Sequence, residues 1–184
     1  IFDGDYPFEV LSFYMEDEYQ VTRDLTLTLG WRWDRYAMAK SSANPRGALI
    51  YKPRPSSTFK LLYGEAFRAP NMYELHYEAP DEAKGNPRLD PEEIHTAEAV
   101  WEQRLSQRLW GLVSLYNYRM EGLLEQRLDP ADALLQFHNT DEVRARGMEL
   151  ECRGFLWRGA TGYVSYVFQR AEETKKELSN SPGQ

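Results

Sequence analysis

The sequence contains one cysteine, three histidines and no apolar run near the roughly 18 residues that a membrane-spanning helix needs. A single cysteine, Cys152, forms no disulfide within the chain and is expected to pack as a small apolar side chain. The missing run excludes a transmembrane helix but not membrane strands, whose alternating residues average out as polar. The first residues lack a basic-then-apolar segment, so the start of any exported precursor is expected upstream.

The signatures of the common enzyme classes are also missing. No Gly-rich phosphate loop, Gly-x-Ser-x-Gly nucleophile or His-Glu-x-x-His zinc helix occurs. The carboxylate pairs Glu16/Glu18 and Glu149/Glu151 are two residues apart, a spacing that strand alternation explains without acid–base chemistry. We therefore expect a protein that is not an enzyme and that holds no cofactor.

Basic residues are outnumbered, with 22 Lys and Arg against 29 Asp and Glu and a net charge of −7. This balance argues against a nucleic-acid partner, which usually requires a basic face. Aromatic residues make up 14% of the chain and include 12 Tyr and 5 Trp. They suit surfaces that are apolar at one end and wet at the other, such as the girdles of membrane barrels or antiparallel sheets in general.

The dominant period of the sequence is two residues. From Leu25 to Asp34 one face reads Leu, Leu, Leu, Trp, Trp and the other Thr, Thr, Gly, Arg, Asp. Successive side chains of a strand point to opposite faces, so this segment is a strand with one apolar and one polar side. The segment from Leu11 to Val21 alternates too, apart from Asp17, and the polar turn Thr22–Asp24 joins the two into a hairpin.

The same alternation predicts about eight strands in an all-β antiparallel meander. Beyond the hairpin, the strands are expected at Arg46–Lys52, Thr58–Arg68, Ile94–Leu105, Arg108–Leu124, Gln136–Phe155 and Ala160–Ala171. Lengths near ten residues suit tilted strands that cross a bilayer.

Short and long connections alternate along the chain. The short ones are Thr22–Asp24, Pro53–Ser57, Ser106–Gln107 and Leu156–Gly159, and the longer ones are Ala37–Asn44, Ala69–Glu93, Asp129–Ala133 and the segment from Glu172 onward. Short turns on one rim and long loops on the other are typical of outer-membrane barrels. Within the longest loop, one helical turn is expected at Asn71–Leu75 with Asn71 as its cap, and another at Pro91–Glu93 with Asp90 as its cap.

Five segments, in the same order, resemble the barrel of TonB-dependent receptors. They are Phe13–Asp34, which ends in Gly-Trp-Arg-Trp-Asp; Tyr63–Pro70 with Tyr73-Glu74-Leu75; Asn86–Glu92, which reads Asn-Pro-Arg-Leu-Asp-Pro-Glu; Leu115–Leu123; and Asn139–Glu151, which contains Arg-Gly-Met-Glu. These matches run along nearly the whole chain.

The resemblance implies that residues 1–184 are a partial β-barrel domain, part of a larger transmembrane β-barrel whose plug domain and closing strands are absent. It implies a place in the outer membrane of a Gram-negative bacterium, in contact with lipid. It also implies uptake of a scarce nutrient, an iron–siderophore or related metal complex, driven by the TonB–ExbB–ExbD energy complex through the plug. Because an open sheet has two unpaired edges, the isolated piece is expected to cover them by self-association, by detergent or by folding differently from the whole barrel.

Charged residues fall on shared strand faces. Arg68 lies on the same face as Lys60, Arg32 is spaced to meet Asp34, and one further face carries Glu149, Glu151 and Arg153. Because charges are costly against lipid, we expect these residues to line a watery lumen, with solvated charges on a soluble sheet as the alternative. Glu65 shares a face with Phe59, Leu61, Tyr63 and Phe67, which is a poor position for a side chain that faces lipid.

The longest loop carries the candidate ligand-binding residues Arg68, Tyr73, Glu74, His76 and Tyr77. Haem-transporting members of the resembled family often place a haem-ligating His in this interval, so His76 is either such a ligand or a solvated loop histidine. No other metal site is expected, because the loop acids Asp81, Glu82, Glu92 and Glu93 lack the spacing of a calcium loop.

Two other classes of function compete with a receptor. A soluble β-barrel module that binds a small apolar ligand closes with about eight strands and has an apolar interior. An enzyme is the third possibility, and no constellation of residues supports it.

Overall fold

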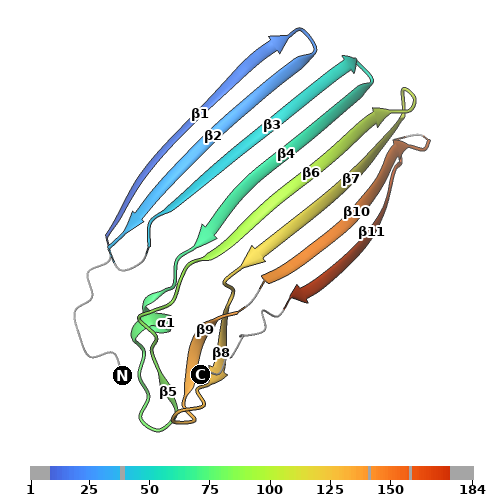
Figure 1. The fold of residues 1–184 in the computed structure, drawn as a ribbon. Helices are drawn as coiled ribbons and strands as arrows, with labels where there is room; N and C mark the ends of the chain where they lie inside the picture. The colour runs from blue at the N-terminus through green and yellow to red at the C-terminus, as the bar shows by residue number, and fades with distance from the viewer. Residues whose placement is uncertain (1–8, 38–39, 141, 158, 175–184) are drawn as a thin grey trace, which may run out of the picture.

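The computed structural model describes residues 9–37, 40–140, 142–157 and 159–174, and is almost entirely β (Figure 1). The long strands are β1 (Val10–Thr22), β2 (Leu25–Tyr36), β3 (Ser42–Arg54), β4 (Ser57–Arg68), β6 (Glu92–Arg104), β7 (Leu109–Glu121), β10 (Glu142–Phe155) and β11 (Thr161–Thr174). The shorter elements are helix α1 (Met72–His76) and strands β5 (Ala83–Lys84), β8 (Leu124–Leu128) and β9 (Leu135–Asn139). None of the helices in these residues is long and apolar enough to cross a membrane.

The eight long strands form one antiparallel meander in the order β1-β2-β3-β4-β6-β7-β10-β11, which confirms the predicted fold class. Successive long strands pair with each other, and the described chain makes long excursions from the sheet between β4 and β6 and between β7 and β10. Short turns join strands at one rim, and both excursions lie beyond the other rim (Figure 1). Strands β1 and β11 are the two edges of this sheet.

The register extends one apolar row across all eight strands. Its members, from β1 to β11, are Tyr19, Leu27, Leu49, Leu61, Ala99, Leu115, Met148 and Phe168. The next row toward the short turns is also apolar and contains Leu25, Tyr51, Phe59, Trp101, Val113, Leu150 and Tyr166. Most of the large side chains in these rows are exposed, so this face is a wide apolar surface, which we call the outward face.

The opposite face is polar and hollowed, and we call it the inward face. It carries Asp34, which is fully buried, together with Asn44, Ser114, Tyr116 and Ala145. Its charged side chains pair with each other: Arg32 forms a forked ion pair with Asp34, at 2.7 and 2.9 Å, and Lys60 Nζ lies 2.5 Å from Glu102 Oε1. The buried side chains lie on the inward face and the exposed large apolar ones lie on the outward face, which indicates that the sheet curls toward its polar side.

Two of the predicted boundaries are wrong around β3. Ser42–Arg54 is one strand of 13 residues, whereas the sequence suggested Arg46–Lys52 between breakers. Pro45 lies inside the strand opposite Trp31, and Pro53 lies where the register shifts between Tyr51 and Arg54. A proline removes only one ladder donor, and at an existing irregularity that donor is not needed.

The segment Gln136–Phe155 is not one strand, and Pro91–Glu93 is not a helical turn. The chain forms β9 up to Asn139 and then β10 from Glu142, in two different sheets. Similarly, Arg108–Leu124 divides at Gly122, whose φ of +64° breaks the strand between β7 and β8. Glu92 and Glu93 pair with Arg68 and Phe67 in the ladder, because strand pairing outweighs the local preference for a capped turn.

Gly147 provides a test of packing on the inward face. The ring of Tyr116 lies over this glycine, and an added Cβ would overlap the end of that ring and lie 2.7 Å from the Phe168 carbonyl oxygen. We expect Gly147→Ala to lower the free energy of unfolding by about 1–3 kcal/mol, as overpacking usually does. Gly64→Ala is the matched control, since its Cβ would have no neighbour nearer than Thr96 Oγ1 at 3.6 Å. Denaturant unfolding of the refolded protein measures the free energy of unfolding of both variants. Equal stability of Gly147→Ala and Gly64→Ala would contradict the packing argument.

Candidate functional site

The segments that leave the sheet meet beyond its long-loop rim in one loop assembly (Figure 1). It contains helix α1 and a three-stranded sheet in the order β5-β9-β8, in which β5 runs parallel to β9. Residues from the β4–β6 connection therefore pair with residues from the β7–β10 connection, about 50 positions away in the chain. The predicted ligand-binding residues all lie at or near the base of this assembly.

Arg68 and Glu74 hold the base of the assembly together. Arg68 Nη1 lies 3.0 and 3.1 Å from the two carboxylate oxygens of Glu74, and Arg68 Nε donates to Glu92 at 2.6 Å. Glu74 is 6% exposed and also accepts the Asn71 backbone N–H at 2.8 Å, while the Asn71 side chain accepts the Glu74 N–H. This reciprocal pair is a capping box, so the predicted Asn71 cap is confirmed. We call Arg68, Glu74 and Glu92 the latch.

Two asparagines extend the latch across the loops. The side-chain amide of Asn139 donates to the carbonyls of Asp90 and Gly122, at 2.8 and 2.7 Å, and its oxygen accepts the Asp90 N–H. Asn86 Nδ2 donates to the Phe137 carbonyl at 2.8 Å. These bonds satisfy backbone groups of the loops and of β9, and an asparagine amide suits these positions because it both donates and accepts.

The aromatic side chains of the assembly form a stacked group. The rings of Tyr73 and Tyr77 lie 4.4 Å apart at an interplanar angle of 23°, and Phe137 from β9 approaches Tyr73 edge-on at 6.1 Å. Tyr73 remains 44% exposed. Of the five predicted residues, the two tyrosines thus form an aromatic surface, whereas Arg68 and Glu74 bind each other.

The three histidines lie in three separate places. His76 ends α1 and is partly buried, and its role as a haem ligand stays a prediction. His138 lies in β9. His95 lies on the outward face opposite Glu65, with Nδ1 3.4 Å from Glu65 Oε1, and Tyr63 donates its hydroxyl hydrogen to the same carboxylate. Glu65 therefore has polar partners at the end of the apolar rows.

One group of metal-ligand types was missed in the sequence. Glu93, His95 and Glu121 place one ligand atom each within 4.8 Å of one another on the outward face. Glu93 and Glu121 are cross-strand neighbours, so only the register brings them together. Arg119 forms an ion pair with Glu121, which already neutralises part of the group.

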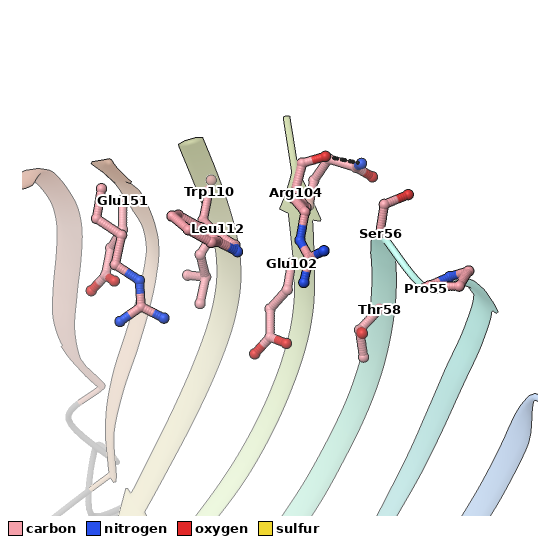
Figure 2. Close-up of a pocket in the computed structure, with 11 residues that line it drawn as sticks. Pro55, Ser56, Thr58, Glu102, Arg104, Trp110, Leu112 and Glu151 are labelled. Atoms are coloured by element: carbon pink, nitrogen blue, oxygen red, sulfur yellow. Dashed lines mark hydrogen bonds between the residues drawn. The ribbon is translucent and has the colours of Figure 1, made fainter. Parts of the chain in front are cut away.

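A hollow of about 260 Å³ lies on the inward face near the short turns (Figure 2). Thr58, Glu102, Leu112 and Glu151 from four neighbouring strands line it, with Arg104 and Trp110 above them. Glu151 and Arg153 both line this hollow, which confirms that they share one face, as their spacing predicted. Nothing in this hollow resembles a catalytic constellation.

Lys84 clamps the tip of the assembly. Its Nζ lies 2.5 Å from Asp129 Oδ2 and 2.6 Å from Asp132 Oδ2, which joins β5 to the loop between β8 and β9. The hydrogen bond to Lys84 lowers the pKa of Asp129 and of Asp132 below the usual 3.8, and the same bonds raise the pKa of Lys84 above 10.5.

The latch predicts a local effect of Glu74→Ala. The Asn71 cap remains, but the Asn71 backbone N–H loses its bond to the Glu74 carboxylate, which costs about 1 kcal/mol, and losing the partly exposed ion pair costs up to about 1 kcal/mol more. We expect faster hydrogen exchange in residues 72–77 and 86–91, with the strands of the large sheet unaffected. Glu82→Ala, an exposed acid of the same loop, is the control. Unchanged exchange in Glu74→Ala would show that the latch does not hold the loop.

The clamp predicts a pH dependence. Lowered carboxylate pKa values mean that the clamp's contribution is present above the unfolded value of 3.8 and disappears as the pH falls below it. The raised pKa of Lys84 means that the contribution is present below 10.5 and is lost only above it. Proteolytic nicking at residues 129–135 should therefore be low and flat between these limits, and uniformly higher in Lys84→Met. Lys52→Met, at the opposite rim, should behave like the wild type; equal nicking in all three would refute the clamp.

Comparisons with known proteins agree with this geometry. The sequence model of the TonB-dependent receptor-like β-barrel matches residues 1–184. The siderophore receptor PirA from Pseudomonas aeruginosa superposes with a TM-score of 0.80 at 19% identity, over 90% of this chain and 32% of that one. The FrpB iron transporter from Neisseria meningitidis gives 0.72 at 18% identity, over 93% and 28%.

A curated relative matches part of the sequence more closely. The vitamin B12 transporter BtuB from Vibrio cholerae is 33% identical over 78 residues, which are 42% of this chain and 12% of the relative. This chain spans about a third or less of the solved structures it matches, and the aligned part is a smaller share of BtuB. The match over every residue of the chain, on a sheet of the same architecture, means that the chain belongs to the TonB-dependent receptor family, within its β-barrel.

Proposed function

We propose that residues 1–184 form one section of the barrel of an outer-membrane receptor that takes up a scarce nutrient, an iron–siderophore or related metal complex, by TonB-dependent active transport. The observation that carries this proposal is the apolar row that crosses all eight strands on the outward face, opposite a polar inward face. Lipid outside and water inside satisfies both faces.

The relatives and the loop chemistry support this class of ligand. A siderophore receptor and an iron transporter share the fold, and a vitamin B12 transporter shares part of the sequence. Catecholate iron chelates and cobalamin are both bulky metal complexes with flat conjugated parts. The stacked rings of Tyr73 and Tyr77 offer such a ligand a surface at the loop rim.

The five candidate residues divide into two roles under this proposal. Tyr73, Tyr77 and His76 contact the ligand, while Arg68 and Glu74 fix the loop on which they lie. The latch supports this division, because both oxygens of Glu74 are already engaged by Arg68. Movement of the ligand through the barrel and coupling to TonB–ExbB–ExbD belong to the plug of the whole receptor.

A soluble module for a small apolar ligand has less support. Such a barrel places its apolar side chains inside and its polar ones outside. Here the buried strand residues include Asp34, Asn44 and Ser114, whereas Leu61, Tyr166 and Phe168 are each more than half exposed.

Ligand titrations test the proposal. The receptor containing this chain, refolded in detergent, is titrated with ferric enterobactin, cyanocobalamin and haemin while tryptophan fluorescence is followed. We expect saturable binding of one of them, weakened about three- to tenfold by Tyr73→Leu, because one ring contact is worth about 0.5–1.5 kcal/mol. Tyr166→Leu, on the outward face, is the control and should bind normally.

Binding of none of the three ligands would overturn the assignment to bulky metal complexes. Haemin binding that is abolished by His76→Ala would mean that the ligand of the receptor is haem and not an iron–siderophore complex. Equal weakening in Tyr73→Leu and Tyr166→Leu would place the ligand elsewhere in the receptor.

A further inference from the structure

On strands β10 and β11, the apolar rows of the outward face end in arginines toward the long-loop rim. The row next to Leu115, Met148 and Phe168, one step toward the long loops, contains Asn117, Arg146 and Arg170. On β2 to β6 the same row is Leu29, Gly47, Tyr63 and Ala97. The boundary between apolar and charged residues thus crosses the strands obliquely, as expected where strands are tilted against a membrane plane.

The arginines are arranged as opposed like charges. Arg146 lies directly opposite Arg170, and Arg144 lies directly opposite Arg119. Cross-strand like charges destabilise a sheet unless a counter-charge lies between them. The cost of this arrangement indicates that an anion compensates it.

The neighbouring carboxylates compensate only part of the charge. Glu142 is shared between Arg119 and Arg144, and Arg170 Nε lies 2.6 Å from Glu172 Oε1. Arg119 also forms an ion pair with Glu121. The three acids Glu121, Glu142 and Glu172 all lie toward the loops. Within the described part of the chain, Arg146 forms no ion pair, although its row is the one that borders the apolar surface.

The arginines also enclose a space. A hollow of about 170 Å³ is lined by Arg144, Arg146, Arg170 and Glu172 on β10 and β11. Several guanidinium groups around one hollow match the geometry of phosphate, whose oxygens accept paired N–H donors.

We propose that Arg144, Arg146 and Arg170 bind the phosphate headgroup of a lipid in the leaflet at the long-loop rim. The proposal rests on the proposed function, because it requires the outward face to contact a bilayer. The acyl chains then lie along Leu115, Met148 and Phe168, one row below the headgroup. The arginine stems reach along the apolar surface while the charged ends stay at the boundary.

The position favours a lipid over a soluble phosphate compound. Residues next to the apolar row lie at the depth of lipid headgroups, where a bound lipid uses both the arginines and the apolar surface. A soluble anion would use the arginines alone and gain nothing from Phe168 or Met148.

The test compares lipids in nanodiscs around the full receptor. Lipid retention is measured by native mass spectrometry in phosphatidylcholine discs that contain lipid A, which carries two phosphates, or its dephosphorylated form. We expect retention of lipid A to fall about thirtyfold in Arg146→Gln/Arg170→Gln, since each arginine near a charged lipid surface contributes roughly a factor of five. The control Arg88→Gln/Arg127→Gln removes the same charge from the loop assembly and should retain lipid A normally.

Three results would overturn the proposal. They are equal retention of the two lipid A forms, equal loss in both double variants, and displacement of lipid A by millimolar inorganic phosphate, which would mean a site for a soluble anion.

A separate labelling experiment distinguishes this failure from failure of the receptor assignment. Single cysteines at Leu27 and Thr28, in a Cys152→Ala background, report the two faces of β2 in the same discs. With the barrel inserted, the Leu27 site is shielded by lipid and the Thr28 site reacts with a small polar reagent. The opposite reactivity would refute the proposed function itself, whatever lipid is retained.

Discussion

The register of the eight long strands is the constraint on which the rest of the structure depends. Side chains alternate between the two faces of a strand, so a slip of one residue between β6 and β7 would carry Leu115 to the inward face and Ser114 to the outward one. Twelve consecutive pairs between these strands, without a bulge, prevent such a slip. The apolar surface, the inward ion pairs and the arginine row all follow from that single alignment.

The loop assembly depends on the same register, although it lies outside the large sheet. Arg68 and Glu92 are the last cross-strand pair of β4 and β6, so the ladder itself brings two members of the latch together. Glu74 then needs only the short path through α1 to reach Arg68. The position of the loops is thus set by the last residue pair of β4 and β6. The same pair also fixes where the stacked rings of Tyr73 and Tyr77 lie.

The sequence predicted the features that depend on neighbours in the chain. The period of two, the hairpin turns and the Asn71 cap are local, and each is present in the structure. The failures lie where distant pairing decides: Glu92 and Glu93 join a ladder instead of a capped turn, and β9 separates from β10 to pair with β8 and β5. Glu93, His95 and Glu121, like the opposed arginines, become neighbours only once the register is known.

Strand length explains why charge is present on the outward face at all. The long strands contain 12 to 14 residues, whereas about 9–11 tilted residues cross a bilayer. The surplus lies at the long-loop end, where the apolar rows stop and Glu65, His95, Arg119 and Arg144 begin. Because Glu65 pairs with His95 and Glu142 pairs with both Arg119 and Arg144, the strand ends on the long-loop side of the apolar rows form a connected base for the loops. A barrel that only crossed the bilayer would need none of this length, so the extra residues are explained by what they support, namely the latch and the ligand-facing loop above it.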